Sequence, residues 1–565
     1  MKINVFVPKI GKNIILDDTR DFIARGGQAA LYGKNQYAFK IYHDPAKMIP
    51  VKKIQELQNI KPDNVLKPID IIYDKRKKPL GYIMTLVKKG HPICKLFTKS
   101  FKTANTISSQ DIVAIAQKSQ MTVADIHSGG FLIVDLNEFN LMISSDFVTP
   151  IFLDVDSYQT PTFPANALME SVRDPLVQNN QFTAMSDWFS WAIVTFQLYV
   201  GIHPYKGSHP NYKRKEWRKR MDEGISVFNK DVSIPSACLP FSVIPKRHLD
   251  WFKEIFVNNG RSIPPLPDSM APVGIITYVS KIIRSGNFKT DEVFSYPDAI
   301  VDIFTDFGIT YIATTSALYR DSKQVAKKKR KNRTLVLIVS GKPVIIDHEA
   351  DTLKLATFDQ KFNVQESASE IMYKDNRLYS VYVDNLFEHI ITDMSGKFIH
   401  TKRLVSRILS NQAKIFDGVI IQRSLNASIV ILPFETGKCI TRTVPELNDY
   451  RILNAKAEGN IMVVLGEKNG LYHRLVFVFS NDFSSYDIRL TEDVSYSDIN
   501  FTVLPDGLCV LVSGDSEIEL FKDNSKVKVV DNPPFDSTMK LFNINGRVHY
   551  VNGNKVFSAT MITNK

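Results

Sequence analysis

The sequence has few cysteines and no long uninterrupted apolar segment, and each absence excludes a class of protein. The four cysteines lie far apart and form no CxxC pair, so neither a disulfide-rich domain nor a cysteine-based zinc site is expected. The apolar stretch from Trp188 to Ile202 contains polar residues and is too short to span a bilayer. The N-terminal segment is interrupted by lysines and lacks the apolar core of a signal peptide. We therefore expect a soluble, cytoplasmic protein that does not contact membranes.

The composition is that of a globular protein with a positive net charge. Hydrophobic residues make up 44% of the 565 residues, aromatic residues 11% and charged residues 23%, which excludes disordered, collagen-like and coiled-coil proteins. The length suggests more than one domain. The net charge of +12 permits weak association with anionic partners. The basic run at residues 327–333 contains no aromatic side chains to stack on bases, so nucleic acid is not an expected partner.

Residues 1–285 mix strand-like and helical patterns. Residues 3–83 are mostly short β segments, with one helix near 48–60. A helical apolar face follows over 108–127 and is opened by a capping box of Ser108 and Asp111. The segment 187–201 is apolar nearly all round, which is typical of a buried helix. A β-rich region followed by a helical one predicts an α+β domain.

The C-terminal part has a different pattern of short β segments separated by Asn-Gly and Asp-Gly turns, which are typical of hairpins. The segments recur at spacings of roughly 35 to 47 residues, a period that fits four-stranded blades of a β-propeller. Six or seven blades are both compatible with the spacing, and a pair of β-sandwiches is the structural alternative. We expect a connector at 286–295 and an all-β domain at 296–565. The repeat units begin near residues 299, 335, 370, 413, 453, 500 and 539.

Two segments in the N-terminal part have the residues needed to hold phosphates. Gly26, Gly27 and Gln28 form a turn between two predicted strands, where backbone N–H groups can approach phosphate oxygens without obstruction by Cβ atoms. Lys40 lies in an apolar strand and needs an anion, because an unpaired buried ammonium is costly. Glu56, in the predicted helix, is a candidate partner of Lys40, although a solvated surface glutamate is an equal alternative.

Two further segments offer oxygen ligands. Asp135 is followed five residues later by Asn140 in one loop, and Asp154 ends the next predicted strand. An acid and an amide in a loop, together with a carboxylate on a neighbouring strand, form a ligand set that suits Mg²⁺.

In this order and spacing, residues 1–285 resemble the protein-kinase family, in a divergent bacterial or phage-type form. The resemblance divides the region into a small lobe at 1–87 and a large lobe at 88–285. It identifies residues 23–32 as the Gly-rich loop and Lys40 as the strand lysine of that family. Asp135 to Asn140 then correspond to the catalytic loop.

The resemblance also implies roles for the site residues. Lys40 would hold the α- and β-phosphates of ATP and be positioned by Glu56. Asp135 would orient the acceptor hydroxyl and accept its proton, while Asn140 and Asp154 would coordinate Mg²⁺.

The same resemblance implies how the nucleotide is held. Gly26, Gly27 and Gln28 would cover the triphosphate. Met84 would be the gatekeeper residue, and backbone groups of Leu86 or Val87 would bind adenine.

Several positions depart from the family pattern. The usual His-Arg-Asp is Ile133-Val134-Asp135, so control by an activation-loop phosphate is not expected. Asn137 occupies the position of a lysine that helps neutralise phosphate charge. The metal motif is Asp-Val-Asp; its second acid, Asp156, either supplies an additional metal ligand or, as we expect, caps the following turn.

The resulting hypothesis is a bilobal α+β protein-kinase-like fold followed by an all-β domain, with a six- or seven-bladed propeller favoured. The implied activity is Mg-ATP-dependent transfer of the γ-phosphate to Ser or Thr of a protein. The propeller would recruit the protein substrate or a regulator. The alternatives are a catalytically weak, nucleotide-binding pseudokinase scaffold and a small-molecule kinase.

Overall fold

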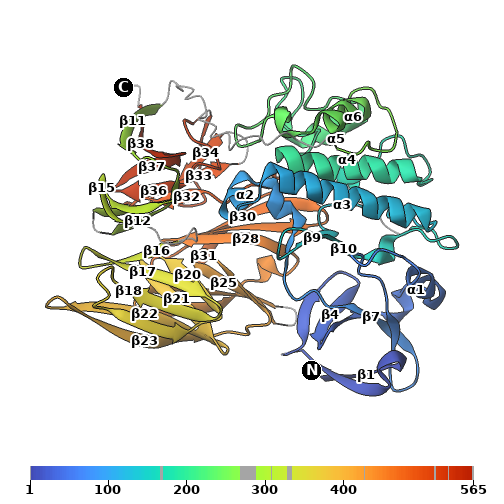
Figure 1. Cartoon of the computed structure of the whole chain (residues 1–565), viewed down its shortest axis with the longest axis horizontal. Helices are drawn as coiled ribbons and strands as arrows, with labels where there is room; N and C mark the ends of the chain where they lie inside the picture. The colour runs from blue at the N-terminus through green and yellow to red at the C-terminus, as the bar shows by residue number, and fades with distance from the viewer. Residues whose placement is uncertain are drawn as a thin grey trace. The chain divides into compact units, whose positions relative to one another are not determined.

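The protein divides into two compact units in a computed structural model of the whole chain (Figure 1). The N-terminal unit comprises Met1–Gly274 and the C-terminal unit Ile275–Lys565. No helix in the described part of the chain is both long and apolar enough to cross a membrane. The structure describes residues 2–18, 20–165, 169–267, 288–306, 308–327, 334–424, 427–513, 517–531 and 533–562.

The predicted fold class is wrong. Strands account for 44% of the structure and helices for 18%, and a bilobal α+β kinase fold is not indicated. The reason lies in strand pairing: the strands between residues 2 and 85 join in one seven-stranded, half-barrel sheet, and the described residues of the C-terminal unit form small four-stranded antiparallel sheets. Most of the basic run at 327–333 lies outside the described residues.

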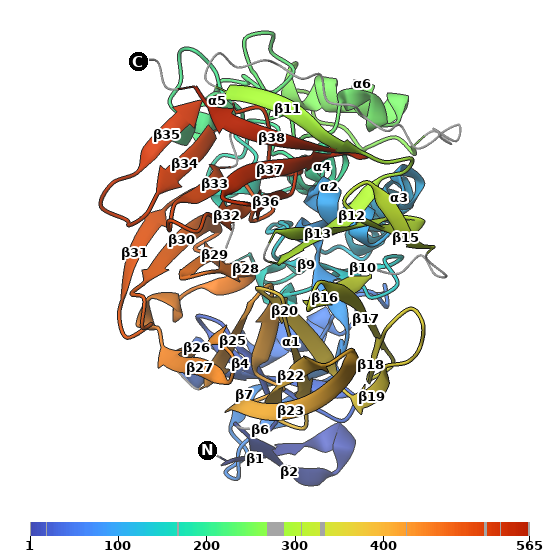
Figure 2. The ribbon, with the colours of Figure 1, turned by 90° about the vertical axis from the view of Figure 1, so that its left-hand side faces the viewer.

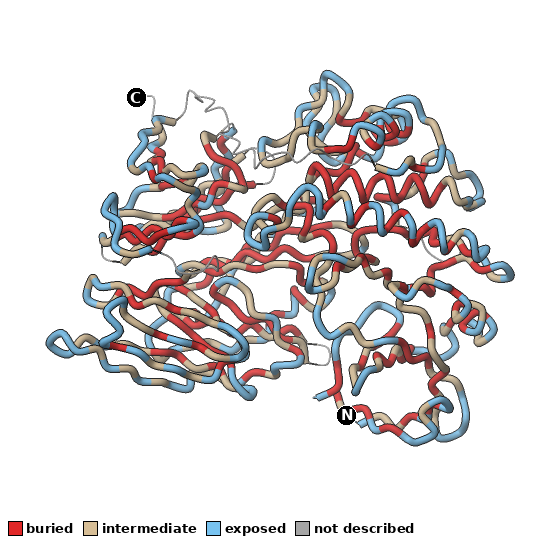
Figure 3. The backbone as a smooth tube through the Cα atoms, in the orientation of Figure 1, coloured by how far each residue is buried: buried red, intermediate tan, exposed pale blue. Residues whose placement is uncertain are grey.

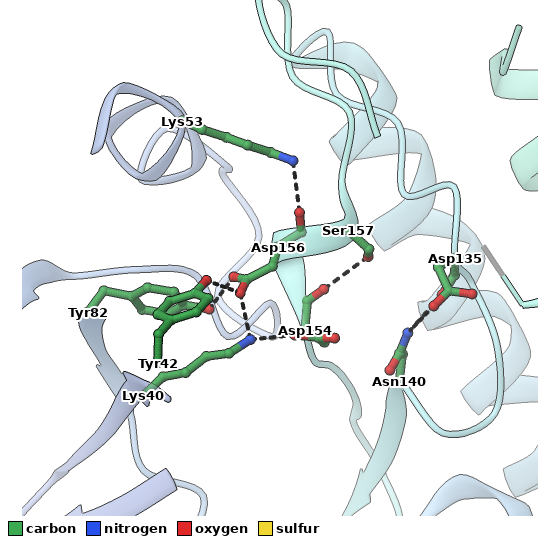
Figure 4. Close-up of polar contacts among 9 residues, drawn as sticks. All are labelled: Lys40, Tyr42, Lys53, Tyr82, Asp135, Asn140, Asp154, Asp156 and Ser157. Carbon is green, nitrogen blue, oxygen red and sulfur yellow. Dashed lines mark hydrogen bonds and ion pairs between the residues drawn. The ribbon is translucent and has the colours of Figure 1, made fainter. Parts of the chain in front are cut away.

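The seven-stranded sheet has the order β2-β1-β6-β7-β5-β4-β3, and its apolar face contains Val5, Phe39 and Ile83. Side chains alternate along β5, so Phe39 and Ile41 enter this core while Lys40 points to the opposite face. The core therefore fixes the direction of Lys40 (Figure 4). The strands are β1 (Lys2–Val7), β2 (Lys12–Asp17), β3 (Phe22–Arg25), β4 (Ala29–Lys34), β5 (Tyr37–Tyr42), β6 (Asp70–Tyr73) and β7 (Pro79–Thr85).

Helices and a small second sheet complete the N-terminal unit. The predicted capping box is confirmed at the start of α3, where Ser108 and Asp111 exchange hydrogen bonds. Helix α4 is buried along nearly its whole length, as predicted from its apolar sequence (Figure 3). The helices are α1 (Val51–Leu57), α2 (Lys99–Ala104), α3 (Ser109–Ser128), α4 (Ala184–Val200), α5 (Trp217–Asp222) and α6 (Lys246–Phe256). The second sheet contains β8 (Gly90–Pro92), β9 (Leu141–Ser144) and β10 (Pro150–Phe152).

The described residues of the C-terminal unit form seven four-stranded antiparallel sheets (Figure 2). The predicted repeat starts agree closely with the first strand of six consecutive sheets and with β36 of the seventh. Predicted hairpin turns are also confirmed, because Asn469 and Gly470 have positive φ and join β29 to β30. The first three sheets contain β12 (Ile300–Asp306), β13 (Ile309–Thr314), β14 (Ala317–Arg320), β15 (Lys323–Lys327), β16 (Leu335–Val339), β17 (Lys342–Glu349), β18 (Thr352–Ala356), β19 (Asn363–Ser367), β20 (Glu370–Lys374), β21 (Arg377–Tyr382), β22 (Asn385–Met394) and β23 (Lys397–Arg407).

The last sheet joins the two ends of the C-terminal unit. Strand β11 (Phe288–Ser295), in the segment expected as a connector, pairs antiparallel with the final strand. Because β11 and the final strand lie far apart in sequence, their pairing holds the two ends of the unit together. The remaining strands are β24 (Ala413–Phe416), β25 (Val419–Ser424), β26 (Ala427–Glu435), β27 (Lys438–Thr443), β28 (Arg451–Glu458), β29 (Ile461–Lys468), β30 (Leu471–Phe479), β31 (Tyr486–Thr491), β32 (Phe501–Val503), β33 (Cys509–Ser513), β34 (Glu517–Phe521), β35 (Lys528–Asp531), β36 (Leu541–Ile544), β37 (Arg547–Asn552) and β38 (Lys555–Met561).

Candidate phosphate and metal site

The hairpin of β9 and β10 brings two predicted metal ligands into neighbouring positions. Asn140 directly precedes β9, and its carbonyl accepts the N–H of Leu153, the residue before Asp154. Asp154 itself has a left-handed backbone conformation with φ of 52°, which is uncommon for a residue other than glycine. The turn directs its side chain toward β5 (Figure 4).

Lys40 bridges two carboxylates of this turn. Its Nζ lies 2.6 Å from Asp154 Oδ1 and 2.7 Å from Asp156 Oδ2. Burial by itself favours the neutral amine, but the charges of Asp156 and Asp154 raise the pKa of Lys40 well above its ordinary value. Lys40 is therefore a fixed cation at the edge of the site.

Asp156 has several polar partners that the sequence did not predict. Besides Lys40, its carboxylate accepts the hydroxyl of Tyr82 at 2.6 Å and the hydroxyl of Tyr42. Burial acts to raise the pKa of Asp156, but Lys40 and the hydrogen bonds hold it below its usual range. The expectation that Asp156 caps the next turn is wrong, because its partners come from β5 and β7.

Helix α1 contributes a different side chain from the one predicted. Glu56 does not meet Lys40; its carboxylate accepts the hydroxyl of Thr162. Hydrogen bonds from Thr160 and Thr162 lower the pKa of Glu56. The residue of α1 that reaches the site is Lys53, whose Nζ donates to the backbone carbonyl of Asp156 at 2.8 Å (Figure 4).

Asp135 and Asn140, which the sequence places in one loop, are joined by hydrogen bonds. The Asn140 amide donates to Asp135 Oδ2 at 3.1 Å and to the Asp135 carbonyl at 3.0 Å. The other carboxylate oxygen, Oδ1, accepts the backbone N–H of Met169 at 2.8 Å. Burial raises the pKa of Asp135 despite these hydrogen bonds, which makes this carboxylate more basic than an exposed aspartate.

The predicted glycine turn lies between β3 and β4 and leaves open space where phosphates could approach. The Gly26 N–H donates to the carbonyl of Ala29 at 2.8 Å, and the Gly26 carbonyl lies 2.9 Å from His43 Nε2. A Cβ atom at Gly27 would meet nothing within 4 Å. Both Gly27 and Gln28 are exposed, so a larger side chain would occupy the open space rather than disturb the core.

The predicted adenine-binding segment follows β7. Met84 is buried in that strand and pairs with Ala38 of β5. The Leu86 N–H already donates to the Gln36 carbonyl at 2.9 Å, so it is not available to adenine in this arrangement. Adenine binding by backbone groups of Leu86 or Val87 stays a prediction.

The residues present fit a weakly protein-coordinated Mg²⁺. Among the described residues, no group of three or more His, Cys, Asp or Glu side chains is arranged to hold a metal ion. Asp154 is 49% exposed at its side chain, and Asn140 uses its amide nitrogen on Asp135, which leaves its amide oxygen as an acceptor. Mg²⁺ retains several waters and needs few protein ligands when phosphates complete its coordination.

The site thus combines a fixed cation, Lys40, with the oxygen ligands of Asn140 and Asp154 and the basic carboxylate of Asp135. Such a set can bind a polyphosphate and accept a proton beside it. No protein-family model and no curated protein matches the chain.

Proposed function

We propose that the N-terminal unit is a Mg-ATP-dependent kinase that phosphorylates Ser or Thr of a protein. The observation that carries the proposal is the convergence of Lys40 and Asp154 at 2.6 Å, beside the Asp135–Asn140 pair. Lys40 comes from β5, far in sequence from the segment 135–154 that supplies the other three residues. The proposal depends on this arrangement of side chains and on no fold class.

Each residue has a distinct task in this proposal. Lys40 binds phosphate oxygens, and Gly26 and Gly27 leave room above them. Asn140 and Asp154 hold Mg²⁺, which supplies positive charge to the phosphates as the γ-phosphoryl group leaves ADP for the acceptor oxygen. Asp135 orients the acceptor hydroxyl and accepts its proton. The C-terminal unit is proposed to recruit the protein substrate or a regulator.

A phosphotransfer assay tests the proposal directly. Purified full-length protein is incubated with γ-labelled ATP, Mg²⁺ and a generic acceptor protein, beside the variants Asp135→Ala and Asp154→Ala. We expect label on the acceptor or on the chain itself, and its loss in both variants. Label that persists in Asp135→Ala, or absence of label with the folded wild type, contradicts the proposed activity.

The contact between Met169 and Asp135 favours a second candidate, a nucleotide-binding pseudokinase scaffold. The Met169 N–H occupies Asp135 Oδ1, the oxygen that an acceptor hydroxyl would need. In this alternative the wild type binds ATP in a manner that depends on Lys40, but transfers no label. Equilibrium binding of ATP to wild type and Lys40→Met, measured beside the transfer assay, separates the two candidates.

A further inference from the structure

We infer that Asp156, and not Glu56, is the positioning residue that holds Lys40 in place for phosphate binding. The inference rests on the proposed function, because it assigns a role within the same site. Asp156 lies 2.7 Å from Lys40 Nζ, whereas Glu56 contacts Thr162. The carboxylate that positions Lys40 is thus supplied by the turn after β10 and not by helix α1.

The burial of Asp156 supports a fixed role. The residue is 7% exposed, and both carboxylate oxygens have partners, with Tyr82 on Oδ1 and Lys40 and Tyr42 on Oδ2. A buried carboxylate that is fully hydrogen-bonded has one preferred orientation. Lys40 Nζ also lies 5.9 Å from the ring centroid of Tyr42 and 5.8 Å from that of Tyr82. Charge and aromatic faces therefore hold the ammonium group together.

The orientation of α1 argues against Glu56 taking over the contact that Asp156 makes with Lys40. Lys53 is 1% exposed and faces the site, where it binds the Asp156 carbonyl. Leu57, one turn later, is buried on the same side of the helix. Turning Glu56 toward Lys40 would have to withdraw Lys53 from its carbonyl and leave a buried ammonium unpaired, which is costly.

The charge balance of the site leads to the same conclusion. Two cations, Lys40 and Lys53, lie beside two carboxylates, Asp154 and Asp156. Glu56 would add a further negative charge to those of Asp135, Asp154 and Asp156 where phosphates are proposed to bind. The two acids also differ in access: Asp154 is 49% exposed at its side chain and Asp156 8%. Asp154 can therefore turn to a metal ion while Asp156 keeps Lys40 in place.

Double-mutant cycles test the inference with two readouts. The first cycle combines Lys40→Met with Asp156→Asn, and the matched control cycle combines Lys40→Met with Glu56→Gln. The free energy of unfolding by urea reports the pairing without any nucleotide. The dissociation constant of ATP with Mg²⁺, measured by equilibrium binding, reports the positioning role. If Asp156 acts through Lys40, Asp156→Asn weakens ATP binding roughly tenfold in the wild-type background and has little effect in Lys40→Met. Glu56→Gln is expected to change ATP binding less than about twofold in either background.

The outcomes separate this inference from the proposed function. An equal effect of Asp156→Asn with and without Lys40, or coupling of Glu56 to Lys40 in its place, overturns the inference. Folded wild type that binds no ATP refutes the proposed function and with it the positioning role, while the unfolding cycle still decides whether Asp156 or Glu56 pairs with Lys40. If Asp156→Asn does not fold, Tyr82→Phe replaces it, because it loosens Asp156 without removing the charge. A loss of ATP affinity in Tyr82→Phe that persists in Lys40→Met then contradicts the inference.

Discussion

The carboxylate of Asp187, in α4, accepts the backbone N–H of Val134 at 2.8 Å. Val134 directly precedes Asp135 and has a φ of 63°, a strained conformation for a β-branched residue. The same carboxylate accepts the Ile133 N–H at 2.7 Å and lies 2.9 Å from His127 Nε2. A fully buried acid in a rigid helix therefore fixes the loop that presents the proposed base.

Asp187→Ala is expected to lower the free energy of unfolding by about 3 kcal/mol or more, because it leaves buried donors without an acceptor. Urea unfolding monitored by tryptophan fluorescence measures the change. Asp250→Ala is the matched control, since Asp250 is exposed in α6 and pairs with Lys246 four residues earlier. The control should change the same quantity by less than about 0.5 kcal/mol. Equal effects of both substitutions would show that Asp187 does not hold the loop.

Local sequence patterns predicted helices and strands correctly where the apolar pattern is long or is bounded by capping or turn residues. The apolar periodicity and capping box of α3 and the apolar sequence of α4 indicated both helices. The turn residues of the C-terminal unit located the starts of the sheets to within a few residues. The fold class was predicted wrongly, because the joining of seven strands into one sheet depends on long-range pairing that local periodicity does not contain.

The candidate site was predicted in part for the same reason. The Asp135–Asn140 pair is separated by five residues and follows from loop spacing. The partners of Asp156 come from far away in sequence: Tyr42 lies 114 residues before it and Tyr82 74 residues before it. Lys53 faces the site and Glu56 faces Thr162 because of how α1 packs against its neighbours. The helix propensity of the α1 sequence does not contain this information.

Arg261 forms a bidentate ion pair with Asp174. Its Nε and Nη2 lie 2.7 and 2.6 Å from the two carboxylate oxygens, and its guanidinium lies 4.4 Å from the ring centroid of Phe189. Lysine cannot reproduce the two parallel hydrogen bonds, so Arg261→Lys is expected to lower the free energy of unfolding by about 2 kcal/mol. Urea unfolding beside Arg25→Lys, an exposed control, measures the difference. A change as small as that of the control would contradict a structural role for the pair.

The backbone contact of Met169 with Asp135 predicts a gain of activity. Met169→Pro removes the N–H that occupies Asp135 Oδ1, and the Met169 φ of −79° is compatible with proline. If transfer occurs, we expect the initial rate with a generic acceptor protein to rise roughly tenfold, the equivalent of one hydrogen bond to a charged group. Met169→Ala retains the N–H and is the matched control. A proline variant that is no faster than the alanine variant would show that this contact does not restrain the base.

The C-terminal unit contains a histidine pair that the sequence did not indicate. His389 of β22 is buried, with Nδ1 3.0 Å from His400 Nε2 and Nε2 2.7 Å from Ser380 Oγ. Glu366 and Lys402, which are 2.9 Å apart, also face the pair. Burial, followed by the neighbouring His400 and Lys402, lowers the pKa of His389 to about 4. His389 is therefore neutral in the folded protein near pH 7.

This histidine should make the C-terminal unit less stable in mild acid. The pKa of an unfolded histidine is about 6.5, so between that pH and about pH 4 the unfolded chain binds more protons than the folded one, and the free energy of unfolding falls as the pH falls. The shift corresponds to a loss of about 3 kcal/mol by pH 4. Urea unfolding of wild type and His389→Asn at pH 7 and pH 4.5 isolates this contribution from that of the carboxylates. The variant should lose less stability between the two pH values than wild type does. An identical loss in both proteins would show that His389 is protonated as easily in the folded chain as in the unfolded one.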